Sequence, residues 1–567
     1  MSTRFCQLFR THRVVVSWIC LLLGIRLLAA IRHRYDIDEA QNLHLAYGWL
    51  NGEWPYRDRF DNHAPLFSML FLPLAALFGE TPHIVLFARL ALFPVGLCVL
   101  WLVYRIGKEL TTEELSLWAV AFCLALADWS LKSVEFRPDV LWAFFWCLAV
   151  WIFIRQCREP SGRGFFGLGI VLGLALCTSI KTTFLVPALA IGWLTAWFGS
   201  ETFRVRFSIA RAAWLMQAAG AGLLLPPVIL FGWMISNGAP WNTIWFCLFE
   251  VNRTPLDWAR IVTGLALAPV VIGCGLLLLR GKSMESTLSA TAAVATGSYL
   301  LALLAFAPEV RKQTLLVAYP LLILLACRYM AFARWPLKFP TPRQGAGLMC
   351  AVTLVHLGFE SDLWNDGLRS HRQLLKQVLA LTDNDDFLMD GRGETIFAKR
   401  PIYLAFVDVV SRGIESKRLE EPAPDILRTT GTAVVIGDLN GFPKELRQYV
   451  KKHYLLVCGG GLRIAGQILE PTWQDGRWIA RAYVEVPAEY VVVRAGRIVE
   501  SRRVERSGVQ AFDLGSNRSV ALLLWSKAWD AGIIPCVNEL GLGTGTKVDV
   551  LRLPGARPTR ANLTCAR

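Results

Sequence analysis

Charge is scarce in this sequence. Only 18% of the 567 residues are Asp, Glu, Lys or Arg, whereas 54% are hydrophobic and the mean hydropathy is +0.42. A soluble protein of this length rarely carries so few charges. The composition therefore argues against an ordinary soluble enzyme and predicts an integral membrane protein.

Cysteine motifs for metal or redox chemistry are also missing. The chain has 14 cysteines but no CxxC pair and no Cys/His cluster with zinc spacing. Most of these cysteines lie within apolar runs, where a thiol acts as a small apolar side chain. No cofactor is expected, and a divalent metal ion is left open as an alternative. No basic stripe interleaved with aromatic residues appears on a soluble segment, which argues against a nucleic-acid partner.

Long apolar runs recur from residue 14 to residue 359 and then stop. We predict a polytopic α-helical membrane protein with about eleven transmembrane helices. The predicted domains are a transmembrane domain at 1–359, a soluble extracytoplasmic α/β domain at 360–470 and a β-rich module at 471–567. The predicted spans are Val14–Ile31, Ile84–Val103, Leu115–Ala127, Val140–Ile154, Phe165–Ser179, Phe184–Phe198, Ala212–Ile235, Ile261–Leu279, Leu288–Ala307, Leu315–Met330 and Gly345–Leu357.

Lys and Arg are concentrated in every second loop between these spans. Short basic loops face the cytoplasm, so most of the +15 net charge is a topology signal. The alternation predicts a cytoplasmic N-terminus and an extracytoplasmic C-terminal domain, in a bacterial inner or plasma membrane. The first span has no small-x-small cleavage site, and we expect it to be an uncleaved helix.

The first outer loop, residues 32–83, is the most informative segment. Asp38 and Glu39 lie where the chain leaves the membrane, and Asp36 beside them is interpreted as a solvated loop acid. A carboxylate can take a proton from a hydroxyl group, so a pair at the membrane surface suits chemistry on a partly lipid substrate. The alternative is that these acids cap the helix that follows, and the two roles are compatible. The apolar segment 65–78 is too short to span and is expected at the interface.

Further charges lie at the outer ends of later spans. Arg137 and Asp139 belong to the sequence EFRPD, Lys181 precedes the sixth span, and Arg311 and Lys312 precede the tenth. Charges at membrane depth are costly and often functional, and Arg or Lys can hold a phosphate leaving group. Each has a structural alternative: an ion pair within EFRPD, a snorkelling Lys181, and cations that anchor a helix end.

The order of these motifs resembles the GT-C glycosyltransferases of family 39, the group of protein O-mannosyltransferases and lipid A aminoarabinose transferases. The resemblance covers residues 14–319 and is carried mainly by Asp38-Glu39 and by PYRDRFDNHAPL at 55–66. It implies a polyprenyl-phosphate sugar donor, a hydroxyl-bearing acceptor (lipid, glycan or protein) and reaction on the non-cytoplasmic face. Two departures are His63, where relatives often have Lys, and Ala40-Gln41 in place of the Arg-Tyr of the lipid A enzymes.

The resemblance also implies roles for individual residues. Asp38 would be the general base toward the acceptor, Glu39 would support it or orient a sugar, and Asp139 would be a second acid of the pocket. The candidates for binding the donor phosphate are His63, Arg137, Lys181, Arg311 and Lys312. No metal ligands are expected.

Two other classes of protein are weighed against an enzyme. A transporter would have as many spans, but the sequence shows no inverted repeat and no clear ionisable pathway within the spans. A non-catalytic subunit of an envelope glycan assembly complex would leave the activity of its complex intact after Asp38→Ala.

Overall fold

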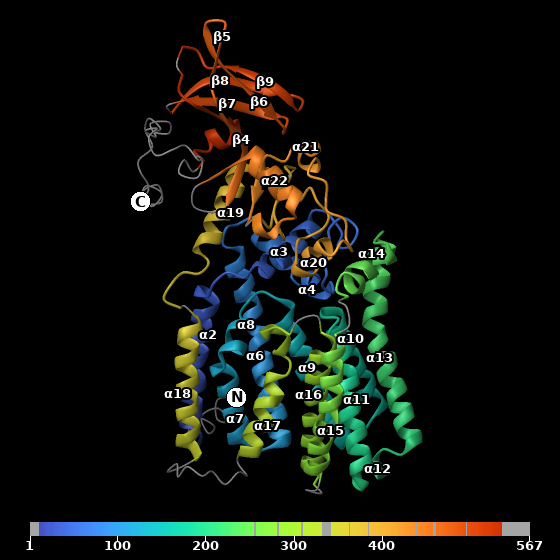
Figure 1. Ribbon diagram of the computed structural model, residues 1–567. Helices are drawn as coiled ribbons and strands as arrows, with labels where there is room; N and C mark the ends of the chain where they lie inside the picture. Colours follow the sequence, from blue (N-terminus) through green and yellow to red (C-terminus); the bar gives the residue numbers. More distant parts are fainter. Residues whose placement is uncertain are drawn as a thin grey trace. The chain divides into compact units, whose positions relative to one another are not determined.

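The chain folds into two compact units that interleave along the sequence (Figure 1). The computed structural model describes residues 11–253, 257–279, 283–307, 310–330, 342–361, 363–383, 385–437, 439–457, 461–494, 496–516, 518–533 and 535. Unit 1 comprises Met1–Glu39, Asp61–Leu74 and Val85–Leu368, and unit 2 comprises Ala40–Phe60, Ala75–Ile84 and Arg369–Arg567. The domain boundaries predicted at 359/360 and 470/471 divide the chain into three consecutive segments, whereas each unit combines several separate segments. These boundaries stay predictions.

Helices dominate the first 361 residues, and each predicted span coincides with one of them. These helices are α2 (Arg13–Arg32), α3 (Ile37–Leu50), α4 (Leu66–Leu70), α5 (Leu72–Phe78), α6 (Ile84–Leu110), α7 (Glu113–Ala125), α8 (Ala127–Lys132), α9 (Pro138–Arg158), α10 (Gly162–Thr178), α11 (Thr182–Gly199), α12 (Glu201–Arg206), α13 (Ile209–Ser236), α14 (Trp241–Trp245), the π-helix η1 (Phe246–Glu250), α15 (Trp258–Leu278), α16 (Met284–Phe306), the 3₁₀-helix η3 (Lys312–Leu315), α17 (Tyr319–Met330) and α18 (Pro342–Ser361).

Length and composition identify the membrane helices. Among the described residues, seven helices are long and apolar enough to cross a membrane: α2, α6, α9, α11, α13, α15 and α16. Shorter apolar helices accompany them at Gly162–Thr178, Tyr319–Tyr329 and Cys350–Ser361. The predicted fold class, a polytopic helical membrane protein, is confirmed, while the number of eleven spans stays a prediction.

Small residues allow two of these helices to approach closely. A Cβ atom added at Gly169 of α10 would collide with the backbone oxygen of Ala219 in α13, and one added at Gly222 would collide with that of Phe166. Membrane helices gain little from hydrophobic burial against one another, so such close backbone contact is a main source of their packing energy.

Unit 2 contains two β-sheets, coloured orange to red in Figure 1. The seven-stranded sheet has the order β1-β2-β4-β10-β7-β8, with β3 paired to β4; β1 and β2 are parallel and the other pairs antiparallel. Its strands come from both sides of the predicted 470/471 boundary. The second sheet has the order β5-β6-β9. The strands are β1 (Leu388–Met389), β2 (Val434–Ile436), β3 (Tyr454–Leu456), β4 (Leu462–Leu469), β5 (Thr472–Gln474), β6 (Arg477–Val484), β7 (Ala488–Arg494), β8 (Arg497–Val504), β9 (Gly508–Asp513) and β10 (Ala521–Trp525).

Helices flank these strands in the sequence of unit 2, in agreement with an α/β segment followed by a β-rich one. They are α19 (Arg369–Leu381), α20 (Asp408–Glu415), α21 (Ile426–Thr429), the 3₁₀-helix η4 (Leu439–Gly441), α22 (Lys444–His453) and α23 (Ser526–Asp530).

Candidate active site

The acidic cluster of the first outer loop starts helix α3 through a capping box. The Asp38 backbone N–H donates to Asp36 Oδ1 at 3.0 Å, and the Asp36 backbone N–H donates to Glu39 Oε2 at 3.1 Å. This reciprocal pattern satisfies two backbone donors that a helix N-terminus otherwise leaves open. Asp36 is therefore the N-cap residue of α3, and its interpretation as a solvated loop acid was wrong because its carboxylate is bound by the helix and by two cations.

Glu39 is fully buried and holds two helices together. Its carboxylate accepts from Arg89 Nε at 2.7 Å and Arg89 Nη2 at 2.6 Å, and from the Phe136 N–H at 2.8 Å. Arg89, on α6, also donates to the carbonyl oxygens of His33 and Arg34 beyond the end of α2, each at 2.8 Å. These contacts favour a supporting role for Glu39 over contact with substrate. Sequence reasoning missed Arg89, although a lone arginine in an apolar helix is a signal for a buried partner.

Arg137 gathers the remaining acids around Asp38. Its Nη1 lies 2.7 Å from Asp38 Oδ2, 3.1 Å from Asp36 Oδ1 and 3.9 Å from Glu135, and its Nε lies 3.2 Å from Asp139 Oδ2. Burial lowers the pKa of an arginine, yet these carboxylates, Asp38 foremost, hold the pKa of Arg137 above its ordinary value. Arg137 therefore remains charged and orients Asp38, and the alternative of an ion pair within EFRPD is confirmed.

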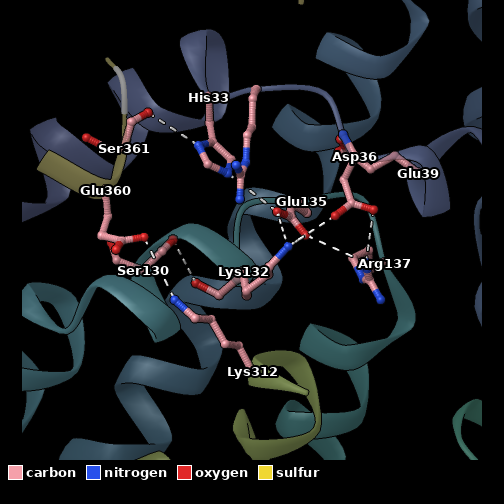
Figure 2. Close-up of polar contacts among 12 residues, drawn as sticks. His33, Asp36, Glu39, Ser130, Lys132, Glu135, Arg137, Lys312, Glu360 and Ser361 are labelled. Atoms are coloured by element: carbon pink, nitrogen blue, oxygen red, sulfur yellow. Dashed lines mark hydrogen bonds and ion pairs between the residues drawn. The ribbon is translucent and has the colours of Figure 1, made fainter. Parts of the chain in front are cut away.

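A second set of polar residues supports this arrangement (Figure 2). Lys132, at the end of α8, contacts Asp36 Oδ2 at 3.1 Å and both oxygens of Glu135 at 2.7 and 2.9 Å. His33 Nε2 lies 3.4 Å from Glu135. Burial raises the pKa of Asp36, but the charges of Arg137 and Lys132 more than offset this and lower it to about 2. Asp36 is consequently ionised, and the sequence prediction did not include Lys132 or Glu135 among its site residues.

His63 lies in the same cluster. Its Nδ1 and its backbone N–H each lie 3.0 Å from Oδ1 of the buried Asp61. Burial lowers the pKa of His63, but the hydrogen bond and charge of Asp61, together with the charge of Asp38, raise it above the ordinary value. A histidine held in this way carries more positive charge near neutral pH than an exposed one. It is thus suited to stabilise a nearby anion.

Lys181 and Arg311 complete the group of cations. Lys181 immediately precedes α11. The pKa of Lys181 lies below its ordinary value, mainly because the side chain is buried. The charges of Asp139 and Asp38 raise this pKa in part, and those of Arg137 and Arg311 lower it. Since these effects require proximity, the structure brings Lys181 and Arg311 together with the acids around Arg137.

Lys312 has different partners. Its Nζ lies 2.7 Å from Asp128 Oδ1 and 3.8 Å from Glu360 Oε2, and its side chain is 54% exposed. Figure 2 shows Lys312 beside Glu360. The contacts of Lys312 fit the alternative of a cation that anchors a helix end.

The arrangement combines two partly exposed acids, Asp38 and the N-cap residue Asp36 (22% exposed), with several cations. The Asp38 side chain is 16% exposed, whereas Glu39 is fully buried and Asp139 is 8% exposed. Within the described part of the chain, no group of three or more His, Cys, Asp or Glu side chains is placed to hold a metal ion. A carboxylate beside Lys181, His63 and Arg311 can accept a proton while the cations stabilise a departing anion.

Comparisons with known proteins concern the fold. The family model described as dolichyl-phosphate-mannose-protein mannosyltransferase matches residues 62–231. Among solved structures, ArnT from Cupriavidus metallidurans bound to undecaprenyl phosphate is similar over 79% of this chain and 98% of that chain, with 12% identity and a TM-score of 0.50. AglB from Archaeoglobus fulgidus, in complex with an inhibitory peptide and a dolichol-phosphate, is similar over 79% of this chain and 73% of that chain, with 12% identity and a TM-score of 0.43. A search of curated proteins found no significant match.

The similarity to ArnT shows the fold, and the family model matches part of that fold. Together they confirm the predicted resemblance to the GT-C glycosyltransferases of family 39, and this is an integral membrane protein with a GT-C fold.

Proposed function

We propose that this protein transfers a sugar from a polyprenyl-phosphate donor to a hydroxyl group of a lipid, glycan or protein. The observation that carries the proposal is Asp38, an accessible carboxylate oriented by Arg137 at 2.7 Å within a group of cations. The partial match to a family named for a dolichyl-phosphate sugar donor, and the likeness of fold to a protein bound to undecaprenyl phosphate, support the same donor chemistry.

Each residue of the cluster has a role in this reaction. Asp38 accepts the proton of the acceptor hydroxyl as the acceptor oxygen bonds to the anomeric carbon of the sugar. The bond between that carbon and the phosphate oxygen breaks, and polyprenyl phosphate leaves with the electron pair. Lys181, Arg311 and His63 stabilise the phosphate charge by charge-assisted hydrogen bonds.

The other acids act through their neighbours. The carboxylate of Asp139 pairs with Nε of Arg137. Glu39 fixes the start of α3, because its carboxylate pairs with Arg89 and accepts from the Asp36 backbone N–H of the capping box. Both therefore position Asp38. The reaction takes place on the non-cytoplasmic face of the membrane, as the alternation of basic loops indicates. The membrane that we propose is a bacterial inner or plasma membrane.

Donor binding provides the test. Purified full-length protein in nanodiscs is titrated with a polyprenyl-phosphate sugar, in wild type and in Lys181→Met. Loss of one charge-assisted contact of about 1.5–3 kcal/mol should weaken donor binding roughly 10-fold or more. Lys312→Met is the matched control, since Lys312 pairs with Asp128 and Glu360. Equal affinities in wild type and Lys181→Met would contradict the assignment of Lys181, and failure of the wild type to bind any such donor would contradict the proposed function.

A further inference from the structure

Unit 2 contains a polar cavity that the proposed reaction does not use. Its volume is about 180 Å³, and segments 41–60 and 387–405 line it. This volume equals that of about six water molecules in the liquid, so the cavity holds a small group and not a whole glycolipid. Three arginines line it, namely Arg59, Arg392 and Arg400, against two acids, Glu53 and Asp58.

Arg59 is buried but keeps hydrogen-bonding capacity. It is 8% exposed; its Nε pairs with Glu53, and its Nη1 contacts His44 Nε2 and donates to the His44 carbonyl oxygen at 3.0 Å. Among the described residues, its Nη2 has no hydrogen-bond partner. A buried guanidinium with a spare donor that lines a cavity favours an external acceptor.

His44 does not supply a compensating charge. Arginine can only donate, so Nε2 of His44 accepts from Arg59, and the Nδ1–H donates to the Ile396 carbonyl oxygen at 3.1 Å. Burial, together with the charges of Arg59 and Arg400, lowers the pKa of His44 well below its ordinary value. The imidazole is therefore neutral and fixed in one tautomer.

Arg400 faces the same cavity and also has a spare donor. Its side chain is 8% exposed; its Nη2 donates to three carbonyl oxygens, those of Asp390, Gly391 and Leu404, at 3.0–3.2 Å. Its buried Nε lies 2.9 Å from Asp390 Oδ1 but makes no hydrogen bond among the described residues. No described residue accepts a hydrogen bond from its Nη1. The charge of Arg400 is close enough to Arg59 to act on its ionisation.

The acids of the lining are already engaged. Glu53 pairs with Arg59, and Asp58 binds Arg57 through both carboxylate oxygens, with Arg57 Nη2 at 2.7 Å from Asp58 Oδ2. Two neighbouring guanidinium groups repel each other, and a bound anion would relieve this repulsion while accepting their unused N–H groups.

We propose that this cavity binds an oxoanion, either a phosphate or a carboxylate, carried by a group no larger than a single sugar. Arg59 Nη2 and the unused N–H groups of Arg400 are its donors. The proposal does not depend on the proposed function, because none of its residues takes part in the transfer step described above.

Ligand titrations of the full-length protein test the proposal. They are made in the Lys181→Met background, which weakens the proposed donor-phosphate site. Inorganic phosphate, glucose 6-phosphate, glucuronate and glucose are compared by the shift of the thermal unfolding midpoint. At least one of the three anions should raise the unfolding midpoint in a saturable way, and glucose should not. A larger shift with phosphate than with glucuronate would identify the bound group as a phosphate, and the reverse would identify it as a carboxylate.

Three variants locate the site. Arg400→Gln and Arg59→Lys should each weaken anion binding by 10-fold or more, and Arg59→Lys keeps the positive charge beside Glu53 so that the fold is retained. Arg477→Gln is the matched control, because Arg477 is 70% exposed and neither lines the cavity nor pairs with an acid of its lining; it should bind as the parent does. Equal anion affinities in all variants, or glucose binding as tight as glucose 6-phosphate, would overturn the proposal.

Discussion

The buried pair of Glu39 and Arg89 gives the sharpest prediction about stability. Both side chains are 0% exposed, and two hydrogen bonds of 2.6 and 2.7 Å join them. Glu39→Gln keeps the size of the side chain but leaves the Arg89 charge buried without its carboxylate. Breaking a buried ion pair from one side costs about 3–5 kcal/mol. We therefore expect the variant to unfold several degrees below wild type.

Thermal unfolding of the purified protein, followed by tryptophan fluorescence, measures this loss. Glu113→Gln is the matched control, because Glu113 is 41% exposed and pairs with Lys108 at the protein surface; its unfolding midpoint should change little. The double variant Glu39→Gln/Arg89→Gln should lose less stability than the two single losses added together, since the pair is coupled. A Glu39→Gln protein as stable as wild type but without turnover would refute the positioning role and assign Glu39 to direct contact with substrate.

Three further predictions concern pH and topology. Donor affinity should fall as pH rises through the raised pKa of His63, because the imidazole loses its positive charge. His63→Gln should remove this pH dependence of donor affinity, and an unchanged pH dependence in the variant would exclude His63 from binding the donor phosphate. Burial and the charge of Asp390 raise the pKa of Glu394 from 4.5 to about 7, so its contribution to stability is full below pH 4.5 and is lost as pH rises through about 7. Glu394→Gln should therefore exceed wild type in stability at pH 8, and lower stability there would contradict this. Reporters fused after Asn51 and after Leu357 should both lie outside the cytoplasm, and opposite locations would refute the topology.

The membrane part of the fold was largely predictable because each helix is a local apolar run of sufficient length. The capping role of the first acids was also predictable, since Asp36 and Glu39 have the spacing of a capping box. Strand β5 carries no such local signal. All three residues of β5 are exposed, so this strand shows no alternation of buried and exposed positions.

The partners within the site could not be predicted, because they are far apart in the sequence. Arg89 lies 50 residues from Glu39, and Arg137 lies 101 residues from Asp36. Such contacts depend on how α2, α3, α6 and α9 pack, and no local pattern contains that information. The same reason explains why Lys312, adjacent to Arg311, was expected at the phosphate but has Asp128 and Glu360 as its partners.

Sugar transfer by Asp38→Asn is the most direct test of the central claim. Purified protein is given a polyprenyl-phosphate sugar and a hydroxyl acceptor, and the release of polyprenyl phosphate is measured in wild type, in Asp38→Asn and in the Glu113→Gln control. Asp38→Asn keeps the size of the side chain but removes the basic carboxylate, so turnover should fall ~100-fold or more while the protein still folds and binds donor. Turnover near the wild-type rate in Asp38→Asn would contradict the account and leave Glu39 or Asp139 as the base.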